Sequence, residues 1–277
     1  MLELDTIITG DCLPILRGMD SKSVDLVFTS PPYNCGIKYD GYSDNLRWED
    51  YLLWCQEWIN ECYRILKDDG RIGINVLIEM GVEDNKRRVN PQVSFSNMMS
   101  NAGFNQMGTA LWQETHRVKY TAWGSWMSAS APYIYNSLEV ILLGYKLTRK
   151  KVDKGISTIS KDDFINGVCG LWKIKPETKS LTAACFPVAL PKLVIDLLTY
   201  KGDTVCDPFL GSGTTAVACI QTGRHYLGIE QSPEYVAIAE RRIKNTFFQE
   251  GMFDTDNEEV PEQKKVLSLE QGGMFSV

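Results

Sequence analysis

Residues 203–215 read Asp-Thr-Val-Cys-Asp-Pro-Phe-Leu-Gly-Ser-Gly-Thr-Thr, and this stretch decides the fold. A short apolar strand ends at Asp207, a glycine loop follows, and a helical pattern begins at Thr214. Gly211 and Gly213 permit positive φ angles and a close approach of the backbone to a ligand. The N–H groups at the start of the helix can bind a carboxylate or a phosphate. The pattern predicts a strand–loop–helix unit of an α/β sheet with a ligand at its loop.

A second strand with a carboxylate at its end follows the glycine loop. Residues 225–230 read His-Tyr-Leu-Gly-Ile-Glu, and in open α/β sheets a carboxylate in the position of Glu230 commonly binds ribose hydroxyls. The loop lacks the third glycine of the dinucleotide fingerprint, because Ala216 stands there, and it lacks the Gly-Lys-Ser/Thr of a P-loop. These features disfavour NAD and nucleoside triphosphates and favour another adenosine-containing ligand.

Residues 29–34 read Thr-Ser-Pro-Pro-Tyr-Asn and end an apolar run that is typical of a buried strand. Pro31 and Pro32 fix φ and remove two N–H groups, so Ser30 and Tyr33 stand on a stiff corner. The corner can hold a planar ring with an exocyclic amine. The ring would stack on Tyr33, and the amine would donate to Ser30 and to the Pro31 carbonyl. The alternative is a proline turn that only ends a strand.

The two motifs together resemble the DNA amino-methyltransferases that use S-adenosylmethionine. The tetrapeptide 30–33 precedes the cofactor loop 207–213, and this permuted order resembles the β group of that family. The resemblance covers most of residues 5–247. It implies an α/β fold, with a Rossmann-like, mostly parallel sheet of the methyltransferase type and a small inserted target-recognition region. It also implies site-specific methylation of an exocyclic amine on a base that is flipped out of double-stranded DNA.

The target base stays open at this stage. In the family, Ser in the first position of the tetrapeptide goes mainly with cytosine N4, and Asp or Asn mainly with adenine N6. Ser30 therefore favours cytosine N4, while Asn34 and the loop after it also occur in adenine enzymes. An RNA or protein-amide methyltransferase is a rival interpretation, and so is a catalytically silent DNA-binding relative. The late cofactor loop and the intact motifs argue against both rivals.

The resemblance also assigns site residues. Asp11 would contact the adenine of the cofactor, although an N-cap role is the alternative. Phe186 would contact its methionine end, with an ordinary core position as the alternative. The expected catalytic residues are Ser30, Pro31, Pro32 and Tyr33. The expected cofactor-binding residues are Asp11, Cys12, Phe186, Asp207, Pro208, Phe209, Gly211, Ser212, Gly213, Thr214 and Glu230. No metal site is expected.

Charge is distributed unevenly along the chain. The net charge is −6, but residues 250–277 hold seven acids and two lysines, so they contribute −5 and the remainder sums to −1. Local basic clusters can therefore still contact phosphates, although each could equally be a solvated surface. Aromatic and basic side chains in three connecting segments, 34–48, 113–136 and 146–154, are expected to face DNA. These are Lys38, Tyr39, Arg117, Lys119, Trp123, Trp126, Lys150 and Lys151.

The expected organisation has four parts. Residues 1–146 form the catalytic half of the methyltransferase domain, and residues 185–248 form its cofactor-binding half. Residues 147–184 fit no sheet strand and are assigned to target recognition. Residues 249–277 form an acidic, flexible tail without a catalytic part.

The remaining composition bounds the cellular setting. The eight cysteines form no C-x-x-C pair, which favours reduced, buried thiols, and no stretch reads as a signal peptide or a membrane span. The chain is therefore expected to be cytoplasmic, without a membrane partner. Double-stranded DNA is the expected partner, and a homodimer and a companion restriction endonuclease stay open.

Overall fold

The computed structural model describes residues 3–39, 42–82, 87–113, 124–134, 136, 138–176 and 185–254. The strands are β1 (Thr6–Thr9), β2 (Val24–Thr29), β3 (Lys38–Tyr39), β4 (Tyr42–Ser43), β5 (Leu66–Leu77), β6 (Met80–Val82), β7 (Arg87–Val89), β8 (Asn105–Gln113), β9 (Leu138–Tyr145), β10 (Leu171–Trp172), β11 (Thr204–Asp207) and β12 (His225–Glu230). The helices are α1 (Cys12–Gly18), α2 (Trp48–Ile65), α3 (Pro91–Ala102), α4 (Lys161–Val168), α5 (Ala189–Leu198), α6 (Thr214–Thr222) and α7 (Pro233–Asp254).

Eight strands form one sheet in the order β1-β12-β11-β2-β5-β9-β8-β10. β9 runs antiparallel to both of its neighbours, and the other pairings are parallel. All six residues of β2 are buried, as expected for a central strand with both faces covered. The prediction of a mostly parallel α/β sheet is confirmed.

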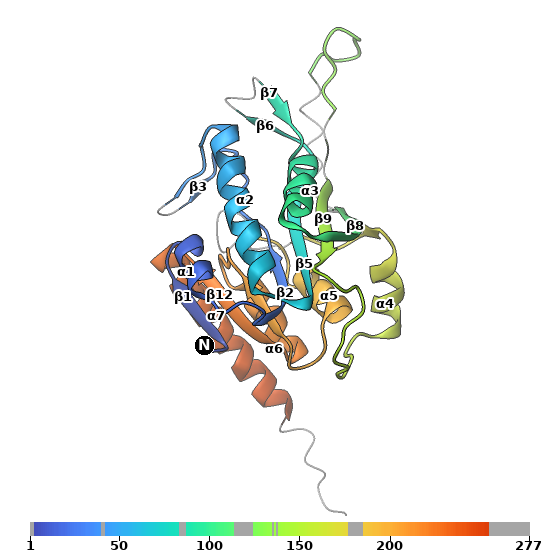
Figure 1. Ribbon diagram of the computed structural model, residues 1–277. Helices are drawn as coiled ribbons and strands as arrows, with labels where there is room; N and C mark the ends of the chain where they lie inside the picture. The colour runs from blue at the N-terminus through green and yellow to red at the C-terminus, as the bar shows by residue number, and fades with distance from the viewer. Residues whose placement is uncertain are drawn as a thin grey trace, which may run out of the picture.

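Helices cover both faces of the sheet (Figure 1). On one face, α1, α2 and α3 bury a core that includes Trp58, Ile59 and Phe95. On the other face, α5, α6 and α7 bury a second core that includes Leu190, Val194 and other small and branched side chains. The sheet therefore separates two apolar layers.

The strand order brings the two sequence motifs together. β11 pairs in parallel with β2, with Val205 opposite Leu26 and Cys206 opposite Val27. This register places Asp207 and Thr29, which are 178 positions apart, at the same edge of the sheet. In parallel sheets ligands bind at the carboxyl ends of the strands, where the strand order reverses.

Two expectations about the organisation of the chain differ from the structure. Residues 147–184 do contribute to the sheet, because β10 pairs in parallel with β8 and α4 precedes it. The chain continues as helix α7 to Asp254, so a separate tail does not begin at residue 249.

Candidate active site

A buried hydrogen bond joins the proline corner to the glycine loop. Thr29 Oγ1 donates to Asp207 Oδ1 at 2.7 Å, and Thr215 Oγ1 donates to Asp207 Oδ2 at 2.6 Å. The N–H of Phe209 also donates to Oδ1, at 3.0 Å. Burial raises the pKa of the Asp207 carboxyl from 3.8 to about 6, against the three hydrogen bonds, which lower it. Asp207 thus links strand β2, strand β11 and helix α6 from one point.

The glycine loop has the conformation that the sequence requires. Gly211 has φ 55° and Gly213 has φ 82°, both in the left-handed region. A Cβ on Gly213 would lie 2.9 Å from Ala239 Cβ on α7, so only glycine lets the loop pack there. A Cβ on Gly211 would meet nothing within 4 Å. The loop is therefore packed against α7 at one glycine and has room beside the other.

Glu230 holds the outer side of the loop. Its Oε2 accepts from the Gly211 N–H at 2.8 Å, and its Oε1 accepts from the Ser232 N–H at 2.8 Å. β1 ends next to it, where the Gly10 N–H donates to the Glu230 carbonyl. Asp11 caps α1 through the Leu13 N–H at 2.9 Å and is exposed, so the N-cap role is present. A capping carboxylate has a second oxygen, and an adenine contact by Asp11 stays a prediction.

Other expected cofactor residues lie around the loop with their side chains packed in the protein. Phe209 packs edge-on against Trp58, with ring centroids 5.3 Å apart, and Phe186 packs edge-on against Phe28 at 5.8 Å. The Cys12 side chain is buried in the core, and burial raises the pKa of its thiol. These residues hold the shape of the loop region, and direct contact with a cofactor stays a prediction for each of them, as it does for Pro208.

Ser212 and Thr214 face helix α7. Arg242 donates to Thr214 Oγ1 at 2.8 Å and lies 3.3 Å from Ser212 Oγ. Both residues are buried. Their side chains therefore hold the loop against α7. The groups of this region that can still bind a ligand are the backbone N–H groups at the start of α6. Arg242 was missed, because one of several cations in an amphipathic helix gives no sequence signal.

The proline corner is braced from α2 and by a polar network. Tyr51 Oη donates to the Pro32 carbonyl at 2.7 Å. No hydrogen bond among the described residues ends on the Pro31 carbonyl, which is the carbonyl that the sequence assigned to the amine. Ser30 Oγ lies 2.8 Å from Tyr33 Oη, so the two hydroxyls of the corner contact each other.

Two further polar residues belong to this corner and were missed. Asn75 Nδ2 lies 3.1 Å from Tyr33 Oη and 2.6 Å from Glu139 Oε2, and Tyr33 Oη lies 3.0 Å from the same Glu139 oxygen. Asn75 is buried near the end of β5, and its Oδ1 has no hydrogen-bond partner among the described residues. A polar residue inside the apolar runs of β5 and β9 was the available signal.

The loop after the corner is closed on itself. Asp44 is buried and accepts from the N–H groups of Asn34, Cys35 and Ile37, at 2.7, 3.0 and 3.0 Å. The Asn34 amide exchanges two hydrogen bonds with the backbone of Leu46. Burial raises the pKa of the Asp44 carboxyl. Asn34 is therefore used to close the loop.

The expected DNA-contacting residues have different outcomes. Arg117, Lys119 and Trp123 lie outside the described residues, as do the side chains of Lys38 and Tyr39. Trp126 is 66% exposed, and Lys150 is exposed.

The assignment of Lys151 to DNA is wrong. Its side chain is 6% exposed, and its ammonium group lies 2.9 Å from Asp25 and 3.2 Å from Asp203. These carboxylates stand at the starts of β2 and β11, at the edge opposite the proline corner. These two carboxylates, of which Asp25 is buried, neutralise the charge that a phosphate contact would need.

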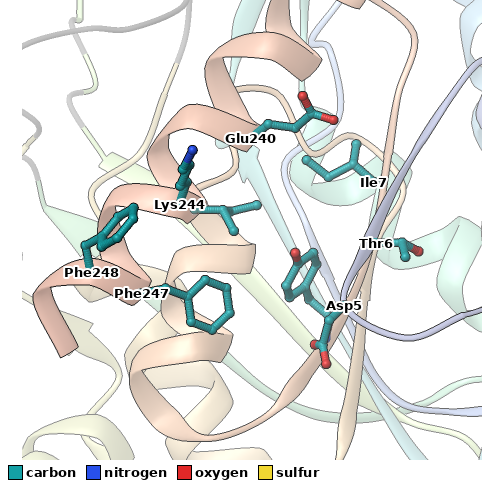
Figure 2. Close-up of a pocket in the computed structure, with 9 residues that line it drawn as sticks. Asp5, Thr6, Ile7, Glu240, Lys244, Phe247 and Phe248 are labelled. Atoms are coloured by element: carbon teal, nitrogen blue, oxygen red, sulfur yellow. The ribbon is translucent and has the colours of Figure 1, made fainter. Parts of the chain in front are cut away.

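A separate hollow of about 670 Å³ lies between the first residues of β1 and the second half of α7 (Figure 2). Phe247, Phe248 and Lys244 line it from α7, and Asp5 and Ile7 line it from the other side. It contains none of the residues of the two motifs. Among the described residues there is no cluster of three His, Cys, Asp or Glu side chains that could hold a metal ion, and no helix is long and apolar enough to cross a membrane.

The site fits the chemistry of S-adenosylmethionine. The open position at Gly211 leaves room for a ligand, the start of α6 offers N–H groups for a carboxylate, and Glu230 stands where ribose hydroxyls bind in such sheets. A mostly parallel sheet with one antiparallel strand, a glycine loop and a proline corner defines a methyltransferase of the class that uses this cofactor.

The particular family follows from comparison with known proteins. Residues 24–241 match the DNA methylase family of N6 and N4 methyltransferases, and the chain belongs to this family. It is 38% identical over 175 residues to the type II methyltransferase M.MjaVI of Methanocaldococcus jannaschii, which covers 63% of this chain and 87% of that protein. It is 28% identical over 266 residues to the type II methyltransferase M.HinfI of Haemophilus influenzae, which covers 87% of this chain and 68% of that protein.

Solved structures show the same fold. The DNA modification methylase TTHA0409 of Thermus thermophilus, complexed with S-adenosyl-L-methionine, matches with a TM-score of 0.69 and 26% identity, over 87% of this chain and 95% of that chain. PvuII DNA methyltransferase matches with a TM-score of 0.66 and 20% identity, over 90% and 93% of the two chains. The family uses S-adenosylmethionine to methylate DNA.

Proposed function

We propose that this chain transfers a methyl group from S-adenosylmethionine to cytosine N4 of a base flipped out of double-stranded DNA. The Thr29–Asp207 hydrogen bond carries the proposal, because it joins the strand that ends in the proline corner to the strand that ends in the glycine loop. A base at Ser30 and a cofactor at Gly211 would therefore share one edge of the sheet.

Each part of the corner has a task in this proposal. S-adenosylmethionine supplies a methyl group on a positively charged sulfur. Ser30 and the Pro31 carbonyl accept the two amine hydrogens, which turns the nitrogen lone pair out of the ring and toward the methyl group. Tyr33 stacks on the base, and Tyr51 holds the corner in place through the Pro32 carbonyl. Alignment of two reactants can lower a barrier by roughly 7–11 kcal/mol.

The choice of cytosine N4 rests on Ser30, and adenine N6 is the alternative. Asn34 had favoured adenine, but its amide is bonded to the Leu46 backbone and does not report on the base. The permuted motif order supports a place in the β group. The type II names of the two relatives support a restriction-modification role with a companion endonuclease.

An exposed aromatic surface supports the DNA partner. Arg88 donates to Tyr133 Oη at 2.9 Å, and its guanidinium group stacks over the Tyr133 ring at 5.1 Å. Trp126 is exposed on the same segment. Exposed aromatic rings beside a cation are suited to unstacked bases and phosphates. We assign this surface and the flanking segments to DNA binding.

The test is methylation of unmethylated genomic DNA with labelled cofactor, followed by mass spectrometry of the nucleosides. The expected product is N4-methylcytosine, and N6-methyladenine would establish the alternative base. Ser30→Ala and Tyr33→Ala should abolish methylation and leave cofactor binding intact by calorimetry. Ser100→Ala, an exposed serine on α3, is the matched control and should methylate normally. An unmodified DNA product with the parent protein would refute the proposal.

A further inference from the structure

The Ser30 hydroxyl is the first member of a hydrogen-bonded chain that ends on a carboxylate. Ser30 Oγ contacts Tyr33 Oη at 2.8 Å, and Tyr33 Oη contacts Glu139 Oε2 at 3.0 Å. Glu139 stands near the start of β9, the antiparallel strand, opposite Leu77 at the end of β5. These hydrogen bonds therefore connect the proline corner to a strand that carries neither of the two sequence motifs.

The direction of this chain follows from the number of protons. A phenol has one proton to donate and two lone pairs that can accept. Among the described residues, the acceptors within reach of the Tyr33 proton include Ser30 Oγ at 2.8 Å, Glu139 Oε2 at 3.0 Å and the Asn75 carbonyl at 3.4 Å. Of these, only the carboxylate of Glu139 is charged, and a charged acceptor makes the stronger hydrogen bond, so it takes the proton. Ser30 must then donate to Tyr33, because the only phenol proton is already used.

The hydrogen bonds of Asn75 favour the same direction of donation, from Ser30 to Tyr33 and from Tyr33 to Glu139. Its Nδ2 donates to Glu139 Oε2 at 2.6 Å and to Tyr33 Oη at 3.1 Å. The carboxylate next to it sets the orientation of the amide, since the amide oxygen would be repelled there. Tyr33 Oη thus receives a proton from Asn75 and gives its own proton to Glu139. Reversal of the chain would need both of these contacts to change.

The direction matters for the amine. When Ser30 donates to Tyr33, the Ser30 lone pairs face the base site and can accept an amine hydrogen. If Tyr33 donated to Ser30 instead, one lone pair would be occupied and the Ser30 proton could turn against the amine hydrogens. Resting on the function proposed above, we propose that Glu139 is a positioning residue that acts through Tyr33 to keep Ser30 an acceptor for the target amine.

The experiment is a double-mutant cycle on single-turnover methyl transfer to DNA. Glu139→Gln keeps the size of the side chain and removes its charge, and Tyr33→Phe removes the hydroxyl and keeps the ring. Glu139→Gln should slow transfer about 10- to 100-fold, the loss expected for one charge-assisted hydrogen bond. The affinities for DNA and for S-adenosylmethionine should stay within roughly two-fold of the parent values. Glu57→Gln, an exposed glutamate on α2, is the matched control and should leave the rate unchanged.

The Tyr33→Phe background separates positioning from a structural role. Tyr33→Phe removes the hydroxyl through which Glu139 is proposed to act on Ser30, so Glu139→Gln should change the rate by less than about two-fold there. An equal loss in both backgrounds, or a normal rate for Glu139→Gln alone, would overturn the assignment.

A second readout needs no catalysis. The Tyr33 Cζ resonance in ¹³C-tyrosine spectra, assigned with Tyr33→Phe, should move in Glu139→Gln and not in Glu57→Gln. An unmoved resonance would also overturn the assignment. An inactive parent protein would instead refute the proposed function, whereas an active parent with a normal Glu139→Gln rate would refute the role of Glu139 alone.

Discussion

Thr29→Val would remove the hydrogen bond that joins the two halves of the site. Valine has nearly the shape of threonine, so the change takes away a hydroxyl and leaves no cavity. Asp207 is 1% exposed, and the Thr29 hydroxyl is one of three donors to its carboxylate. The loss should therefore depend on whether Asp207 is ionised.

The magnitude follows from the Asp207 pKa. Burial raises this pKa from 3.8 to about 6, so the folded protein binds the proton more tightly than the unfolded chain. Stability from this group is fully present below pH 3.8 and is lost as pH rises through about 6, by about 3 kcal/mol in total. A hydrogen bond to a charged group is worth roughly 1.5–3 kcal/mol. Thr29→Val should cost about 2 kcal/mol at pH 7.5 and less than about 1 kcal/mol at pH 5, where folded Asp207 is mostly protonated.

The assay is urea unfolding of the cofactor-free protein at both pH values. Asp207→Asn removes the titrating group. The parent should lose about 1–1.5 kcal/mol of unfolding free energy through Asp207 when pH rises from 5 to 7.5, and the variant should not show this loss. Thr6→Val, which removes an exposed threonine hydroxyl bonded to the Glu3 carbonyl, controls for the substitution itself. A Thr29→Val loss of equal size at both pH values would show that the bond to ionised Asp207 is not what the hydroxyl provides.

Three further changes test other parts of the structure. Lys151→Met should lower the free energy of unfolding by about 3 kcal/mol, because it leaves buried Asp25 without one of its cations, and DNA affinity in filter binding should not change. Gly213→Ala should cost about 1–3 kcal/mol and weaken cofactor binding in calorimetry, since its Cβ would meet Ala239 at a positive φ. Tyr51→Phe should slow single-turnover transfer with little change in cofactor affinity, because the carbonyl of Pro32 loses its hydrogen-bond donor.

The sequence predicted the elements that local patterns define. The apolar run of β2 and the glycine loop before α6 were located correctly, because strand burial and positive φ angles leave direct traces in residue type. β10 was missed, since a two-residue strand is defined by its partner β8 and has no period of its own. The length of α7 was underestimated, because acidic residues after 248 suggested a tail, whereas the same residues can also continue a helix.

The site was predictable to the extent that its residues lie in motifs. Ser30 and Tyr33 came from a tetrapeptide, but Glu139 reaches them only because β9 lies beside β5 in the sheet. Lys151 shows the opposite error. A lysine in a basic run looks like a phosphate contact, and only the tertiary structure brings two carboxylates to it. Contacts across the sheet have no signature along the chain, so neither result could be read from the sequence.

The buried ion pairs also limit which segments can read the DNA sequence. Residues 147–160 are held where the strands begin. Lys151 pairs with Asp25, and Arg224 donates to Thr158 and pairs with Asp196. In the function proposed above, the base enters at the other end of the strands, where the proline corner lies.

The hairpins β3–β4 and β6–β7 project beyond that end of the strands, together with the segment that carries Trp126 (Figure 1). We infer that target recognition is divided among these projections and the residues after 160. An exchange of residues 147–160 for those of a relative with another target sequence should therefore leave the methylated sequence unchanged. A changed target sequence in that chimera, measured by sequencing of the methylated sites, would contradict the inference.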